Sequence, residues 1–291
     1  MGKRNRKRRR SRRSGKRDLA WRRDLVIGLT TAVVGLVAAW FVGPLQEVRS
    51  QEEVRQSEEE RLRGQPSLLH EAVYDFGSTS SLLFAFARPL DDAGKRLLSD
   101  PKAVTMSAGQ LLKDYEPLQI APKSHQNQQK ALSQIRITLN GNRTKPVLIK
   151  SIVPRITKRL SPWNGSLVGR WPEGQDTTVR LGFDLDRPAE ATAINDTGEW
   201  VGRYIDDHFI SLELGEPIVL IANVVTATCY CEWVFDLTTR SGTDESVVVV
   251  DNDGEPFRMT AFAPPYTSEF ELSPDTGRYE DVTDQEERWA R

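Results

Sequence analysis

The sequence predicts a mainly β protein: an extracytoplasmic antiparallel β-sandwich or Greek-key barrel-like domain attached to an N-terminal transmembrane helix and a helical stalk. Three observations predict this fold class. An uncharged run of 22 residues, 25–46, follows a strongly basic segment. Residues 67–264 alternate apolar and polar side chains with a period of two, as half-buried strands do. Turn residues interrupt this pattern repeatedly, and no alternation of strands with helices indicates a parallel sheet.

The composition excludes several other classes. Of the 291 residues, 28% are charged and 38% are hydrophobic, and there are two Cys. These values exclude a disordered chain, a disulfide-rich mini-protein and a multi-span membrane protein. The formal net charge of −1 conceals a division, because residues 1–23 hold 13 Lys and Arg against one acid, Asp18. This asymmetry predicts an anionic partner for the basic end.

The basic cytoplasmic tail, residues 1–24, is expected to remain unfolded because residues 3–17 include no apolar side chain. It acts as a topology signal and binds anionic lipid of the inner leaflet, where each base near the surface adds about 1 kcal/mol of attraction. Nucleic acid is the weaker alternative, because no aromatic residue lies between the bases to stack on.

Residues 25–46 predict a transmembrane helix. Its apolar part, Leu25–Val42, would span about 27 Å, close to the thickness of a hydrocarbon core. Trp21, Trp40 and Phe41 lie near its ends, where aromatic rings anchor helices at the membrane interface. The positive-inside rule then keeps the N-terminus in the cytoplasm and places the C-terminal domain outside a plasma membrane that the chain crosses once.

Small side chains at Gly28, Ala32, Gly35 and Ala39 share one face of this helix. Such a face lets two membrane helices approach closely and would support a homodimer. The competing interpretation is that Gly and Ala are simply common in membrane helices. A cleaved signal peptide is a further alternative to the anchor, although residues 38–40 do not form an A-x-A cleavage site.

Two segments flank the predicted β domain. Residues 47–66 form a helical stalk that ends at Gly64 and Pro66, and its sparse apolar positions favour an exposed spacer over a coiled coil. Residues 265–291 mix acids and bases with Pro and Gly without periodicity, which predicts a flexible acidic tail.

Within 67–264 the alternation predicts eight to ten short strands and two short helical pieces, near 90–99 and 107–115. Ile135–Leu139 leads into an Asn140–Asn142 hairpin-type turn, and the return strand stops at Pro154, which should lie at an edge or a break. The apolar run Ile218–Val225 predicts a central strand. The other expected strands are 81–88, 179–185, 210–214, 229–237, 247–250 and 257–262, the last two joined by an Asp-Gly turn.

Four stretches resemble predicted single-pass membrane-anchored proteins of unknown function from high-GC Gram-positive bacteria. They are QIRITLNGNRTKPVLIKSIVPRITKR, PWNG, CYCEWVFDL and DNDGEPFRMTAF, and they cover about half of the external domain. The resemblance implies no catalytic residues.

Cys229 and Cys231 are the only cysteines, and an extracytoplasmic compartment permits a disulfide. Both alternate onto the face that carries Trp233, Phe235 and Leu237, so both sulfur atoms are expected in the core. In an extended strand their Cα atoms would lie about 6.6 Å apart and their Cβ atoms about as far, beyond disulfide reach. A bond therefore requires a bulge or a turn at Tyr230, and two buried thiols are the alternative.

The sequence offers no recognisable catalytic, cofactor or metal site. His70, His125 and His208 are scattered, without metal-ligand spacing. Asp184 and Asp186 could hold calcium, but outward-facing strand carboxylates are usually only solvated, and this is what we expect of them. The Ser99–Lys102 match to S-x-x-K has no companion motif.

The sequence therefore predicts a non-enzymatic envelope protein whose external β domain binds an unknown protein or glycan or has a structural role. Two alternatives remain. One is an envelope hydrolase with an unrecognised site, and the other is a transmembrane signalling or assembly component that acts through the basic tail.

Overall fold

The computed structural model describes residues 54, 57–75, 83–100, 108–169, 180–195, 198–273 and 275–283. The chain divides into two compact units, Met1–Glu60 and Arg61–Arg291. Residues 57–63 are helical, and the rest of the fold belongs to the second unit. Among the described residues, no helix has the length and apolar character needed to cross a bilayer. The predicted membrane helix 25–46 and basic tail 1–24 lie outside the described residues, as do residues 47–53, 55 and 56 of the stalk 47–66.

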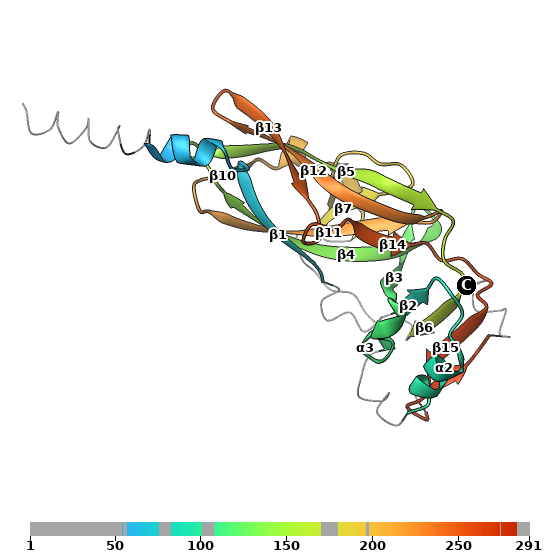
Figure 1. The fold of residues 1–291 in the computed structure, drawn as a ribbon. Coiled ribbons are helices and arrows are strands. Elements are labelled where there is room, and N and C mark those ends of the chain that lie inside the picture. The colour runs from blue at the N-terminus through green and yellow to red at the C-terminus, as the bar shows by residue number, and fades with distance from the viewer. Residues whose placement is uncertain are drawn as a thin grey trace, which may run out of the picture. The chain divides into compact units, whose positions relative to one another are not determined.

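Strands dominate the second unit and form two sheets (Figure 1). The larger sheet has the order β16-β15-β6-β2-β3-β4-β11-β7-β8-β9, and β1 also pairs with β4. Its strands are β1 (Leu68–Tyr74), β2 (Leu83–Phe86), β3 (Leu118–His125), β4 (Gln128–Gly141), β6 (Ser166–Gly169), β7 (Arg180–Asp184), β8 (Thr192–Ile194), β9 (Trp200–Arg203), β11 (Pro217–Thr226), β15 (Ser268–Leu272) and β16 (Tyr279–Asp281).

The smaller sheet has the order β10-β5-β12-β13, and β14 also pairs with β12. Its strands are β5 (Val147–Leu160), β10 (Ile210–Leu212), β12 (Tyr230–Ser241), β13 (Asp244–Val250) and β14 (Phe257–Thr260). The short helices are α2 (Asp92–Leu98), α3 (Ala108–Leu111), η2 (Lys113–Tyr115) and α4 (Tyr204–Asp207).

The main core is shared by the two sheets. Ile135 and Ile137 of β4 belong to the same buried cluster as Trp233, Phe235 and Leu237 of β12. Both strands alternate in burial, so each turns one face inward, and burying these faces supplies the main driving force for folding. The mainly β prediction is confirmed, and the arrangement is consistent with a β-sandwich.

A second, smaller core lies among β2, β6, β15, α2 and α3, at the lower right of Figure 1. Phe84, Phe86, Val168 and Phe270 are its central strand residues. Helix α2 begins at a side-chain cap, because the Asp91 carboxylate accepts a hydrogen bond from the Gly94 N–H at 2.8 Å.

The expectation of a flexible tail at 265–291 is wrong for the part that the structure describes. Ser268–Leu272 forms β15, which pairs in parallel with β6, and Tyr279–Asp281 forms β16 beside it. The aromatic ring of Phe270 is buried in the smaller core, and this burial holds the segment in the sheet.

Three details of the predicted strands also change. Two strand pairs, β7 with β11 and β6 with β15, are parallel, although the sequence predicts only antiparallel pairing. The segment Asn140–Asn142 is not a hairpin turn, because β4 and β5 belong to different sheets. β5 continues through Pro154, where β12 pairs on one side and β10 reaches only Val147–Ile149 on the other, so the proline needs no ladder hydrogen bond there.

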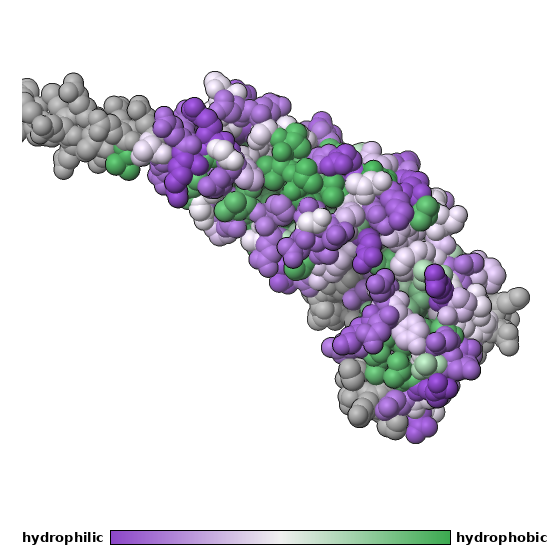
Figure 2. Space-filling view, viewed as in Figure 1, coloured by the Kyte–Doolittle hydropathy of each residue, from purple (hydrophilic) through white to green (hydrophobic). Residues whose placement is uncertain are grey.

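Several large apolar side chains remain exposed on the strands. They include Leu69 and Val73 of β1 and Val247 and Val249 of β13. Figure 2 shows apolar surface in the region where Figure 1 draws β12 and β13.

Candidate functional site

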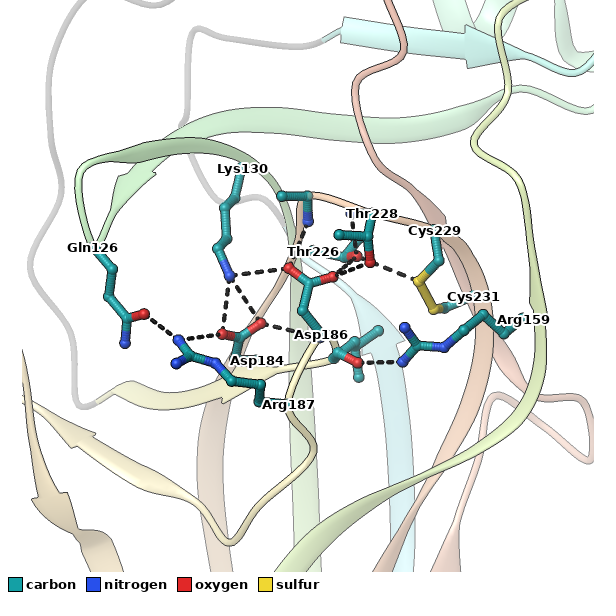
Figure 3. A network of polar contacts seen from close by, with 12 residues as sticks. Gln126, Lys130, Arg159, Asp184, Asp186, Arg187, Thr226, Thr228, Cys229 and Cys231 are labelled. Atoms are coloured by element: carbon teal, nitrogen blue, oxygen red, sulfur yellow. Dashed lines mark hydrogen bonds and ion pairs between the residues drawn. A yellow bond between two sulfur atoms is a disulfide. The ribbon is translucent and has the colours of Figure 1, made fainter.

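The most distinctive polar arrangement in the described residues is centred on Lys130, near the start of β4 (Figure 3). β11 lies between β4 and β7, with Thr226 opposite Ala131 and Val225 opposite Asp184. Phe183 and Leu185 turn inward to the core, so Asp184 turns to the outer face of the sheet. Lys130 therefore reaches across the end of β11 to the end of β7.

Lys130 is a buried lysine whose three N–H groups all have acceptors. Its Nζ lies 3.0 Å and 2.9 Å from Oδ1 and Oδ2 of Asp184, and 3.0 Å from Oδ2 of Asp186. The side chains of Lys130, Asp184 and Asp186 are only 3%, 10% and 13% exposed. A buried charge is stable only when it is paired and hydrogen-bonded, and this cluster meets that condition.

Asp186 accepts further hydrogen bonds from the turn that follows β11. The Thr226 and Thr228 hydroxyls donate to its Oδ1 at 2.7 Å and 2.6 Å, and the Ala227 N–H donates to its Oδ2 at 2.8 Å. Burial alone would raise the pKa of the Asp186 carboxyl, but these donors and Lys130 outweigh burial and lower the pKa to about 2. Asp186 is therefore a carboxylate at neutral pH.

The disulfide lies beside the same turn. Cys229 and Cys231 are both buried, and the structure joins them with their Cα atoms 5.5 Å apart. This separation is shorter than in a fully extended strand, although Tyr230 is itself a strand residue that pairs with Thr260 and Leu160. The expected turn or register shift at Tyr230 is therefore absent from the structure. The Thr226 hydroxyl lies 3.3 Å from the Cys229 sulfur, which connects the disulfide to the aspartate cluster.

Two arginines border the cluster. Arg187 donates to the Gln126 side chain and lies 3.4 Å from Oδ2 of Asp184. Arg159 of β5 donates to the Leu185 carbonyl at 2.5 Å, so it attaches the smaller sheet to the chain between the two aspartates.

Aromatic rings cover the neighbouring part of the outer face. The rings of His125 and Trp200 lie 4.1 Å apart, and the indole ring of Trp200 occupies the space that a Cβ at Gly182 would need. Burial lowers the pKa of His125, and the nearby charge of Lys130 lowers it further. This histidine is therefore neutral at pH 7 and does not offset the negative charge of the aspartates.

The expectation that Asp184 and Asp186 are solvated is wrong, because Lys130 and the β11–β12 turn enclose both. Sequence reasoning did not identify Lys130, since a lysine on the outer face of a strand is usually solvated. The only signal was the D-x-D spacing, which places both carboxylates on one face.

The other residues singled out in the sequence do not form a site. No group of three or more His, Cys, Asp and Glu side chains suited to a metal ion occurs in the described residues. His70 lies 3.9 Å from Asp251, and the ring of His208 stacks on Tyr204. The proposed helix-contact and membrane-interface residues lie outside the described residues: Gly28, Ala32, Gly35, Ala39, Trp21, Trp40 and Phe41.

Comparison with known proteins gives little further information. No protein-family model matches the chain, and no curated protein matches it. One similar solved structure is described as the "X-ray structure of Northeast Structural Genomics Consortium target SoR45". It has 12% sequence identity and a TM-score of 0.29, over 50% of this chain and 81% of that chain. Similarity at this level supports no argument about fold or function.

Proposed function

We propose that this chain is a single-pass membrane protein that presents its β domain outside the cytoplasm, where the domain binds a protein or glycan partner or has a structural role. In this proposal residues 25–46 are the membrane anchor, residues 1–24 contact anionic lipid, and the domain is a β-sandwich without enzymatic activity. The topology is inferred from the uncharged 22-residue run and the 13 bases that precede it.

The disulfide supports the location. Disulfides persist in oxidising compartments and are rare in the cytosol. A bond between Cys229 and Cys231 therefore fits a domain that has crossed the membrane.

The Lys130 cluster supports a structural role over an enzymatic one. All three lysine protons are used within the protein, and Asp186 is satisfied by hydroxyl and backbone donors. A cluster whose groups are hydrogen-bonded to one another is suited to holding structure rather than to turning over a substrate.

The topology is tested with the full-length chain in intact spheroplasts. A tag placed after Arg291 should be digested by added protease, and a tag placed before Lys3 should be protected. The matched variant replaces the bases of residues 3–17 with Gln, which removes the orienting charge and should yield a mixed population. Protection of the C-terminal tag together with digestion of the N-terminal tag would refute the proposal.

Partner binding is tested separately. The exposed valines of β13 offer apolar surface, and apolar surface is common at protein contacts. If a protein partner uses this strand, replacing both Val247 and Val249 with Thr should weaken capture by the immobilised unit 61–291, whereas replacing the exposed Phe209 with Thr should not. Equal capture by all three forms would exclude β13 as the binding surface.

A further inference from the structure

The Lys130 cluster holds an amine and a carboxyl group within reacting distance. Nζ lies 3.0 Å and 2.9 Å from the two oxygens of Asp184, and both oxygens are bonded to the same carbon, Cγ. The amine nitrogen is therefore about 3.3 Å from that carbon, within the separation of a near-attack conformer. Because Nζ contacts both oxygens, it lies near the plane of the carboxylate and must move over one face of that group before it can attack. Lys130 and Asp184 come from strands that are not neighbours, because β11 lies between β4 and β7.

The site also excludes most of the water that would keep this pair as separate ions. The lysine side chain is 3% exposed and the Asp184 side chain is 10% exposed. Closing a site to water strengthens the electrostatic interactions inside it and prevents side reactions such as hydrolysis. Holding the two groups at this separation raises their effective concentration, which reaches about 10⁵–10⁸ M when the reacting orbitals are also aligned.

A third group is placed to move protons. Oδ2 of Asp186 lies 3.0 Å from the same Nζ (Figure 3). The Thr226 and Thr228 hydroxyls and the Ala227 N–H fix the orientation of this carboxylate. Asp186 can therefore accept a proton from the lysine without being consumed.

From this geometry we propose that Lys130 and Asp184 condense into an intramolecular amide, with Asp186 as the proton relay. The Lys130 ammonium gives one proton to Asp186, which passes it to an oxygen of Asp184. The nitrogen lone pair then attacks Cγ and forms the C–N bond. The nitrogen loses a second proton through Asp186 to the same oxygen, the C–O bond breaks, and that oxygen leaves as water. Nothing is oxidised or reduced, and Asp186 ends as it began.

The amide would be a covalent link between β4 and β7, 54 residues apart in sequence, across the end of β11. It would close the cluster permanently, whereas the Cys229–Cys231 disulfide closes a loop of only three residues. This link is independent of the membrane topology proposed above, because its chemistry needs only the folded β domain.

The experiment is mass spectrometry of the purified, reduced full-length chain and of its tryptic digest. The intact mass should be lower, by the mass of one water molecule, than the mass calculated from the amino-acid sequence. The digest should contain a branched peptide in which Lys130 is uncleaved and joined to the peptide that carries Asp184. An intact mass without the loss, with cleavage after Lys130 and only linear peptides, would overturn the proposal.

Variants assign the three roles. Lys130→Arg keeps the cation but lacks the reacting amine, so its mass should equal that of its own sequence. Asp184→Asn keeps a carbonyl carbon in place, so it should lose ammonia in place of water. Asp186→Asn should form the link at least tenfold more slowly after refolding. Formation at the wild-type rate would show that Asp186 is not the relay.

The chain provides a matched internal control. Lys158 lies 3.1 Å from Oε1 of Glu232, a similar separation, but its side chain is 51% exposed. Its peptide should be linear, because water has free access to this pair. A branched peptide at Lys158 as well would show that burial does not direct the reaction and would refute the reasoning.

Discussion

Replacing Asp186 with Asn is expected to destabilise the β domain at neutral pH but not in strong acid. The donors around Asp186 lower its pKa from 3.8 to about 2 in the folded state. This lowering of the pKa corresponds to about 2 kcal/mol of folding stability, which the neutral side chain of Asn cannot supply. The expectation holds with or without the amide link, because Thr226, Thr228 and Ala227 donate to Asp186 in either case.

The sign follows from the direction of the shift. A carboxyl group whose pKa is lower in the folded state adds stability that is fully present above its unfolded pKa of 3.8. That stability is lost as the pH falls through the interval from 3.8 to about 2, since the unfolded chain takes up the proton first. The wild-type domain should therefore weaken across this interval more than the Asp186→Asn variant does.

The assay is urea denaturation of the unit 61–291, wild type and variant, from neutral pH to about pH 2. The difference in unfolding free energy should be about 2 kcal/mol at neutral pH and should vanish at the acid end. Asp236→Asn is the matched control, because Asp236 pairs with the half-exposed Arg155 and such pairs contribute about 0–1 kcal/mol. A difference for Asp186→Asn that stays constant with pH would refute the reasoning.

Three further predictions concern the core and its borders. Replacing Cys229 and Cys231 with Ala should lower the free energy of unfolding by on the order of 1–3 kcal/mol, mainly through lost packing. Neither sulfur should react with thiol reagents in the native, unreduced domain, and rapid labelling would contradict this. Gly182→Ala should destabilise by about 1–3 kcal/mol in urea melts, because its Cβ would lie 2.7 Å from an indole ring, whereas Gly64→Ala, with open space around it, should not. Ending the chain at residue 264 should expose the smaller core and increase binding of a hydrophobic dye, whereas ending it at 283 should not; equal dye binding would count against the role of β15.

Local patterns were sufficient to predict the central strands. In β12 the alternation of Trp233, Phe235 and Leu237 with polar or less buried residues placed all three in the core, and the structure buries them. The Asp253-Gly254 turn was also predictable from its residue types, and both residues adopt the positive φ angles that such turns require. These features depend only on neighbouring residues.

Features that depend on distant partners were not predictable. β15 is a five-residue strand among acidic residues, and its partner β6 lies about a hundred residues earlier, so its sequence resembles a tail. Lys130 has the pattern of a solvated residue, and only the later residues Asp184 and Asp186 show that it is enclosed. A period-two pattern identifies the face on which a side chain lies, but it does not identify what covers that face.

The parallel contact between β6 and β15 has a consequence for the order in which the domain can fold during synthesis. A chain that emerges N-terminal end first exposes Phe84 and Phe86 long before Phe270 arrives to cover them. Until then the part of this surface that Phe270 covers stays open to association with other chains. The smaller core is therefore the last region to close, and a ribosome that stops short of Ser268 releases a product in which it cannot close.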